Sequence, residues 1–178
     1  MEAFNRLVQK GKARHIGASN LSAWRLEQAR TLSRSNGWAQ YGCVQQRHTY
    51  LRPKHGADLE GLQLCVNDDL LDYCEENKAF HLLAYSPLLS GAYTRPDRPL
   101  PPQYATPDTE ARLVTLREVA NESTATLNQV VLAWMMQGDP AIIPVISAST
   151  RSQLDENLGA LQITLSDDQL RRLTSAGA

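Results

Sequence analysis

The stretch HLLAYSPLLSGAYTR (residues 81–95) changes character at its middle and is the clearest strand signal in the chain. Its first half is a short apolar run with the length and composition of a buried strand. Pro87 and Gly91 in the second half prevent that strand from continuing. Tyr85 stands at the break, and by position alone a tyrosine that ends an apolar strand is more often a core residue with a satisfied hydroxyl.

Outward from this stretch, short apolar runs alternate with segments of helical spacing. Strands are predicted at residues 14–19, 43–48, 80–85 and 141–147. Helices are predicted at residues 1–10, 22–32, 69–77, 109–120 and 126–137, followed by two more that begin at residues 150 and 166. Strands separated by helices favour parallel βα units, because a parallel pair needs a long crossover connection. A doubly wound sheet also fits, although no G-x-G-x-x-G turn is present.

Local signals mark several helix starts and one long loop. Thr126, Thr150 and Ser166 are each followed three residues later by a glutamine, which is the spacing of a capping box. Residues 91–107 include five prolines among seventeen residues, which favours a surface loop over a regular element.

Composition limits the classes of function. The chain has 178 residues, 42% of them hydrophobic, and a formal net charge of -1. The balanced charge gives no reason to expect binding to nucleic acid or to an anionic membrane. No apolar run approaches the ~20 residues that cross a bilayer, and residues 1–12 lack the apolar core of a secretory signal. We therefore expect a single cytoplasmic domain over residues 1–178, whose three cysteines are reduced.

Four stretches, taken in order and at their separations, carry a family resemblance: GKARHIGASNLSAWRLEQA (11–29), VQQRHTYL (44–51), LLAYSPLLSG (82–91) and IPVISASTRSQLDENLGAL (143–161). Together they resemble the second half of an aldo-keto reductase. The resemblance implies a (β/α)8 barrel that reduces carbonyl compounds with a nicotinamide cofactor lying across the C-terminal ends of the strands. A typical barrel has ~250 residues. The expected fold is therefore α/β, a partial (β/α)8 TIM barrel of about four parallel strands with flanking helices, equivalent to barrel strands five to eight.

The resemblance assigns residues to the nicotinamide carboxamide. Ser19 and Asn20 match a pair that hydrogen-bonds this group, and a hydroxyl and an amide supply the donor and acceptor that it requires. Gln46 matches a glutamine that also reaches it, and strand alternation places Gln46 on the face of Val44, which makes Gln45 the less favoured partner. The alternatives are that Ser19 and Asn20 form a simple strand-to-helix turn and that the glutamines are satisfied barrel-lining residues.

The third motif is assigned to the nicotinamide ring and the pyrophosphate. Tyr85 matches the aromatic residue on which the nicotinamide ring stacks, at a strand end where barrel sites are built. Ser86, Leu88 and Ser90 match a strap over the pyrophosphate. The small residues near Gly91 would let backbone N–H groups approach phosphate closely.

The fourth motif departs from the family pattern. Ser147, Ala148 and Ser149 are uncharged where many members place a basic residue for the adenosine 2′-phosphate, and Gln153 stands where an arginine often contacts it. Arg151 is close enough in sequence to substitute, or else it is a solvated residue at a helix start. The resemblance implies NADP as the cofactor, and these departures make NAD the alternative.

The adenine end is assigned to the helix that follows. Glu156 and Asn157 match a pair that binds the adenine amine. The alternative is that both are exposed polar residues on a surface helix.

The chain lacks residues that match the catalytic tyrosine, lysine, aspartate and histidine, which lie in the first half of family members. His48 and Tyr50 have no paired lysine or carboxylate nearby in sequence to shift a proton affinity. Cys43, His48 and His55 lack zinc-ligand spacing, and neither GxSxG nor HExxH occurs. No catalytic or metal-binding residue is predicted, and the chain alone is expected to be inactive.

Two classes of function remain. The first is a truncated NAD(P)H-dependent reductase that retains the cofactor-binding half and, when complete, acts on a small carbonyl substrate. The alternative is a non-catalytic half-barrel that binds dinucleotide or forms oligomers. In both cases the open barrel edges predict self-association.

Overall fold

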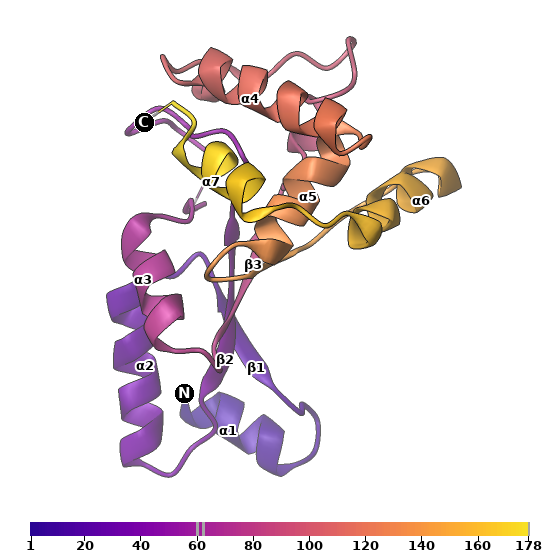
Figure 1. Cartoon of the computed structure of the whole chain (residues 1–178). Helices are drawn as coiled ribbons and strands as arrows, with labels where there is room; N and C mark the ends of the chain where they lie inside the picture. The colour runs from indigo at the N-terminus through magenta and orange to yellow at the C-terminus, as the bar shows by residue number, and fades with distance from the viewer. Residues whose placement is uncertain (60, 62, 178) are drawn as a thin grey trace.

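A sheet of parallel strands forms the centre of the computed structural model, which describes residues 1–59, 61 and 63–177 (Figure 1). Its four strands lie in the order β1-β2-β3-β4. They are β1 (Ile16–Ser19), β2 (Tyr41–Arg47), β3 (His81–Tyr85) and β4 (Ile142–Pro144). All three neighbouring pairs are parallel. The α/β class predicted from alternating strands and helices is therefore confirmed.

One helix precedes the first strand, and the others connect successive strands or follow the last one. They are α1 (Glu2–Gln9), α2 (Ala23–Ser35), α3 (Asp68–Glu76), α4 (Thr109–Glu122), α5 (Leu127–Gln137), α6 (Arg151–Gly159) and α7 (Asp167–Ser175), with short 3-10 turns η1 (Leu89–Gly91), η2 (Pro102–Tyr104) and η3 (Ala160–Gln162). Residues 91–107 are largely irregular, as the prolines predicted. β4 is shorter than the predicted 141–147 because its neighbour β3 ends at Tyr85 and turns away, which leaves no strand to pair with residues beyond Val145.

The local capping signals are mostly confirmed. Thr126 and Ser166 each form a complete capping box at the start of α5 and α7. At α6 the Thr150 hydroxyl accepts the Gln153 N–H, but the Gln153 side chain accepts from Ser149 N instead of closing a box. These caps satisfy N–H groups that a helix start leaves without partners.

The two faces of the sheet have different surroundings. Val44, Leu82 and Ile142 are buried in one hydrophobic core that also contains side chains of α2, α3 and α5. Alternation turns the neighbouring residues to the other face, where Ser19 is exposed and Ile143 is 49% exposed. The helices therefore cover one face of the sheet and leave the other open.

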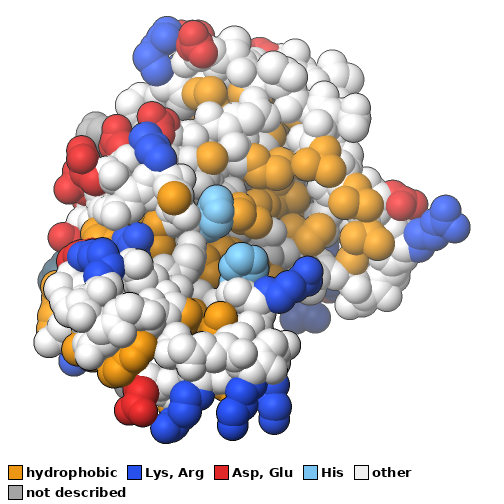
Figure 2. Space-filling model, turned by 90° about the horizontal axis from the view of Figure 1, so that it is seen from below, with side chains coloured by type: hydrophobic (Ala, Val, Ile, Leu, Met, Phe, Trp, Pro, Cys, Tyr) orange, Lys and Arg blue, Asp and Glu red, His pale blue; other side chains and the backbone are white. Residues whose placement is uncertain are grey.

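Apolar side chains are also exposed on α6 and η3, which follow the last strand. Three exposed leucines lie on one side of this segment at helical spacing: Leu154 and Leu158 in α6, and Leu161 in η3. Figure 2 shows hydrophobic side chains gathered across the middle of the molecule and onto the projecting end on the right, where Figure 1 places α6. Among the helices of the described residues, none has the length and apolar character needed to cross a membrane.

Candidate functional site

Three side chains at the carboxyl ends of β1 and β3 form a hydrogen-bonded cluster. The Asn20 side-chain oxygen accepts from Tyr85 Oη at 2.9 Å and from the Leu64 N–H at 3.0 Å. Asn20 Nδ2 donates to Ser19 Oγ at 3.2 Å. Asn20 has a φ of 51°, a left-handed conformation that asparagine tolerates better than most residues. Ser19, Asn20 and Tyr85, which were predicted to act together, thus lie together.

The strand register decides which glutamine joins this cluster. Ser19 pairs with Gln45, and Tyr85 pairs with Arg47. Because side chains alternate along a strand, Gln45 and Arg47 share the face of Tyr85, and Gln46 points to the opposite face. The structure therefore does not bring Gln46 to Ser19 and Tyr85, and Gln45 has that place.

Gln46 has instead the surroundings of a core residue. It is 2% exposed, and its Nε2 donates to the Cys65 carbonyl at 3.1 Å. Gln46 does share the face of Val44, as strand alternation predicted. That face is the one that the helices cover. The register thus places Gln45, not Gln46, beside Ser19 and Tyr85, and the assignment of a glutamine to the carboxamide stays a prediction.

Tyr85 provides an aromatic ring rather than an acid. Burial raises the pKa of its hydroxyl, and the nearby Arg47 guanidinium opposes that shift more weakly. The hydroxyl therefore stays protonated at neutral pH and acts as a hydrogen-bond donor to Asn20. The half-buried ring is left as a flat apolar surface beside polar groups.

The segment after Tyr85 is a tight turn with unusual backbone angles. Ser86, Leu89 and Ser90 have φ values of 55°, 48° and 57°, and Gly91 follows at 93°. Thr49 Oγ1 donates to the Pro87 carbonyl at 2.7 Å and holds the turn in place. Successive residues in such conformations make concave groups of N–H donors that suit anions.

This turn forms one wall of a cavity of about 540 Å³. The other walls come from the end of β4, from α6, from the start of α5 and from the proline-rich segment. Eight residues predicted from the sequence as cofactor ligands line it: Ser86, Leu88, Ser90, Ser147, Ser149, Gln153, Glu156 and Asn157. They come from two segments that lie far apart in the sequence.

The α6 side chains are already engaged within the protein. Glu156 Oε1 accepts from Thr126 Oγ1 at 2.8 Å and from Asn128 Nδ2 at 3.3 Å, beside the start of α5. A carboxylate is favoured there by the helix dipole. Asn157 is buried, and its Nδ2 lies 3.4 Å from the Ser147 carbonyl that it donates to. A ligand would therefore meet a preformed wall.

Sequence reasoning missed several residues of this cavity, among them Asn128, Arg95 and Arg98. Asn128 is buried, and its Oδ1 has no hydrogen-bond partner among the described residues. Arg95 pairs with Asp97 at 2.5 Å, and the Arg98 side chain makes no hydrogen bond or ion pair with the described residues. The two arginines lie in the proline-rich segment 91–107. Their positive charge is the one sequence signal that could have marked them as functional residues rather than ordinary loop residues.

His48 and Tyr50, the two residues considered from the sequence as acids or bases, lie elsewhere. His48 stacks on Trp134 and Tyr50 meets the same ring edge-on, both on the helix side of the sheet. Burial raises the pKa of Tyr50 to about 12. In the part of the chain that the structure describes, no group of three potential metal-ligating His, Cys, Asp or Glu residues occurs.

Comparison with known proteins identifies relatives along the full length. The profile of the Aldo/keto reductase family matches residues 1–178. Aldo/keto reductase slr0942 of Synechocystis sp. is 30% identical over 177 aligned residues, which cover 97% of this chain and 45% of that protein. Aldo-keto reductase yakc [NADP(+)] of Schizosaccharomyces pombe is 28% identical, and versiconal hemiacetal acetate reductase of Aspergillus parasiticus is 24% identical. Alignments to these two cover 99% and 97% of this chain and 52% and 51% of the relatives.

A solved structure of a relative is likewise matched over about half of its length. The thermostable aldo-keto reductase Tm1743, crystallised with the inhibitor epalrestat, superimposes with a TM-score of 0.72 at 28% sequence identity. The match covers 98% of this chain and 53% of that one. The chain thus spans about half the length of its relatives, and its four parallel strands and helices match half of an aldo-keto reductase barrel.

Proposed function

Because this chain belongs to the aldo/keto reductase family, we propose that it is the carboxyl-terminal half of a nicotinamide-dependent carbonyl reductase and holds the cofactor. The remaining half of the barrel, from the rest of a longer chain or from a separate one, would supply the catalytic acid. The substrate class is a small aldehyde or ketone.

The proposal rests mainly on one observation. Two segments predicted separately to hold a dinucleotide, the turn after β3 and the stretch from the end of β4 into α6, line one cavity of about 540 Å³. That cavity begins at Ser86, which follows Tyr85 directly. The carboxyl ends of the strands, where barrel sites are built, thus carry a continuous row of candidate ligands.

The residues present fit such a cofactor chemically. Ser86, Leu89, Ser90 and Gly91 have positive φ values, a backbone geometry that can form a concave anion site. The Leu89 and Gly91 N–H groups already donate within this turn, so an anion would be met by other N–H groups of the segment. Arg95 and Arg98 add positive charge to the cavity wall. The unpartnered Asn128 Oδ1 offers an acceptor to an amine or a hydroxyl. These groups match the phosphates and the adenosine of a dinucleotide.

The nicotinamide end would rest on the strand-end cluster. Ser19, Asn20 and Gln45 would orient the carboxamide, and the Tyr85 ring would cover one face of the nicotinamide. When bound, the reduced nicotinamide supplies the electrons for carbonyl reduction. Tyr85 itself would not donate a proton to substrate, because burial raises its pKa and no lysine or carboxylate bonds to it among the described residues.

We propose NADP as the cofactor, with NAD as the alternative. The α6 residues that line the cavity offer no positive charge for the adenosine 2′-phosphate, since the exposed Arg151 pairs with Asp155 at 3.6 Å and does not line the cavity. Arg98, which lines the cavity and makes no hydrogen bond or ion pair with the described residues, can supply that charge from across it. The name of the Schizosaccharomyces pombe relative specifies NADP(+).

Titration of the purified chain with NADPH and NADH tests the cofactor assignment. Arg98→Gln should weaken NADPH binding about tenfold and leave NADH within about twofold, because only NADPH carries the 2′-phosphate. Arg151→Gln is the matched control and should change neither. Equal losses in the two variants, or no binding of either dinucleotide by the unmodified chain, would contradict the assignment.

An activity assay tests the division of labour between the two halves. The chain alone should give no NADPH-dependent reduction of a generic aldehyde above the background rate. The reason is that no tyrosine near the strand ends bonds to a lysine or carboxylate that would tune it as a general acid, among the described residues. Adding a folded first half from a family member should restore turnover. Turnover by the chain alone would show that some other group provides the proton.

The alternative is a half-barrel that binds dinucleotide or assembles without turnover. It is favoured by the open face of the sheet and by the exposed apolar residues of α6. Dinucleotide binding without restored turnover in the mixing assay would support it.

A further inference from the structure

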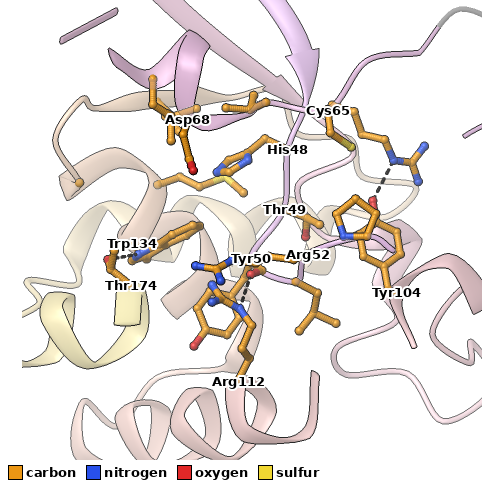
Figure 3. Close-up of a pocket in the computed structure, with 18 of the residues that line it drawn as sticks. His48, Thr49, Tyr50, Arg52, Cys65, Asp68, Tyr104, Arg112, Trp134 and Thr174 are labelled. Carbon is orange, nitrogen blue, oxygen red and sulfur yellow. Dashed lines mark hydrogen bonds between the residues drawn. The ribbon is translucent and has the colours of Figure 1, made fainter. Parts of the chain in front are cut away.

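A second cavity, of about 560 Å³, lies among α3, α5, α7 and the segment that follows β2 (Figure 3). It is lined by Trp134 and Met135 of α5 and by the helix-facing Ile142 of β4. It therefore opens on the helix-covered side of the sheet, away from the Tyr85 face. Nothing in the proposed function uses it, and its argument is independent of that proposal.

Positive charge dominates the lining of this cavity. Its ionised side chains are four basic and two acidic: Arg47, Arg52, Lys54, Arg112, Asp68 and Asp139. Of the two acids, Asp139 already pairs with Lys78 at 3.2 Å. Among the described residues, Arg47 bonds only to neutral groups, the Tyr104 hydroxyl at 2.9 Å and Gln63 at 2.7 Å. The cavity thus holds more positive charge than its own acids neutralise.

Arg112 carries one of the unneutralised positive charges of this cavity, and its side chain is buried. It is 2% exposed, its Nε donates to the Tyr50 carbonyl at 2.9 Å, and its Nη1 donates to the Ala176 carbonyl at 2.7 Å. Its guanidinium also lies 4.4 Å from the centre of the Tyr50 ring. These hydrogen-bond partners are neutral, and Asp108 attracts the guanidinium without forming an ion pair with it. The charge is therefore only partly compensated, which is costly in a buried site.

Arg52 adds a second guanidinium to the same region. Figure 3 shows both arginines beside Tyr50, and neither forms an ion pair with a carboxylate in the described ranges. Burial lowers the pKa of Arg112, and the charge of Arg52 contributes in the same direction. Two like charges that converge on a cavity are stabilised by an anion between them.

The neighbouring wall is aromatic. The His48 ring stacks on Trp134 with centroids 5.6 Å apart, and Trp134 Nε1 donates to Thr174 Oγ1 at 3.0 Å. Burial lowers the pKa of His48 to about 4, so its ring is neutral at neutral pH. Figure 3 places Asp68 on the His48 side of this wall, which disfavours a second negative charge there. The cavity therefore has one cationic end and one flat apolar wall.

We propose that this cavity binds a small organic monoanion, a carboxylate carried on an aromatic or apolar body. The carboxylate would meet Arg52, whose planar group suits bidentate contact, and Nη2 of Arg112, the guanidinium nitrogen that has no hydrogen bond in the described residues. The body would lie against Trp134 and His48. The volume falls within the ~300–1,000 Å³ range of small-molecule sites.

Benzoate is the probe, and the indole N–H signals of Trp24, Trp38 and Trp134 report its position by NMR. Benzoate should shift the Trp134 signal, assigned with Trp134→Phe, and should leave that of the exposed Trp24 unmoved. Benzyl alcohol, which lacks the charge, and inorganic phosphate, which lacks the body, should each bind at least about tenfold more weakly.

Arg52→Gln is the decisive variant because, unlike Arg112, the Arg52 side chain has no hydrogen bond to lose in the described residues. It should weaken benzoate binding about tenfold, whereas Arg98→Gln in the other cavity should leave it within about twofold. An unmoved Trp134 signal at tens of millimolar benzoate would overturn the proposal. Equal binding of benzyl alcohol or of phosphate, or an unchanged affinity in Arg52→Gln, would overturn it as well.

Discussion

Gly17 of β1 lies where a side chain would collide with the neighbouring strand. A Cβ added there would meet Cys43 Sγ and would lie 3.1 Å from the Cys43 carbonyl oxygen. Gly17→Ala should therefore destabilise the fold by roughly 1–3 kcal/mol through overpacking. Gly42→Ala is the matched control, because nothing lies within 4 Å of its added Cβ. Chemical denaturation of both variants checks this, and equal stability would contradict it.

His48 makes stability depend on pH. Burial lowers its pKa from 6.5 to about 4, so between these values the unfolded chain binds more protons than the folded one. The contribution of His48 to the free energy of unfolding is fully present above pH 6.5 and is lost as the pH falls to about 4. The loss is roughly 1–3 kcal/mol.

Urea denaturation at pH 7 and pH 4.5 measures this effect. His48→Gln should show a smaller loss of stability on acidification than the unmodified chain. His81→Gln, which alters an exposed histidine, should keep the full loss. The same pH dependence in all three proteins would show that His48 does not contribute.

The glutamine pair shows where prediction at the residue scale ends. Alternation correctly separated Gln45 from Gln46, since a strand has a period of two residues. It could not say which face the helices cover. Val44 and Gln46 took the covered face, and Gln45 joined Ser19 and Tyr85.

At the scale of elements, helix caps are the most local part of the fold. Ser166 forms a complete capping box with Gln169 at the start of α7. Ser166→Ala should cost about 1 kcal/mol, because a Gln169 N–H loses its acceptor.

Ser22 offers a matched control for that cap. It occupies the N-cap position of α2, but its side chain makes no capping hydrogen bond. Ser22→Ala should therefore cost only a few tenths of a kcal/mol. Thermal unfolding of both variants tests the difference, and equal losses would contradict the assignment of the bond.

For the molecule as a whole, the open face and edges of the sheet predict association of the isolated 178-residue chain. β1 and β4 each have one neighbour in the sheet, Ile143 is 49% exposed, and Leu161 is 63% exposed. Unpaired parallel edges and apolar patches of this kind favour pairing with other chains.

Sedimentation should therefore detect species larger than the 19.8 kDa monomer. Replacing Leu158 and Leu161 by lysine should reduce the amount of these larger species, because it places charge among the exposed leucines of α6 and η3. Leu32→Lys is the control, since this leucine is similarly exposed but lies on α2. A monodisperse monomer that unfolds cooperatively would count against association.

The sequence by itself determined the type and order of the elements, the parallel connections and two of the three capping boxes. It also carried the family resemblance. These features depend on the period of apolar residues and on contacts within a few positions, which the local sequence specifies.

Only the tertiary structure decided which face of β2 is covered, and that Asn128, Arg95 and Arg98 line a cavity with α6. It also decided that Arg52 and Arg112 converge on a second cavity. These juxtapositions join residues far apart in the sequence, and they follow from how the helices pack on the sheet. No pattern within a single segment encodes that packing.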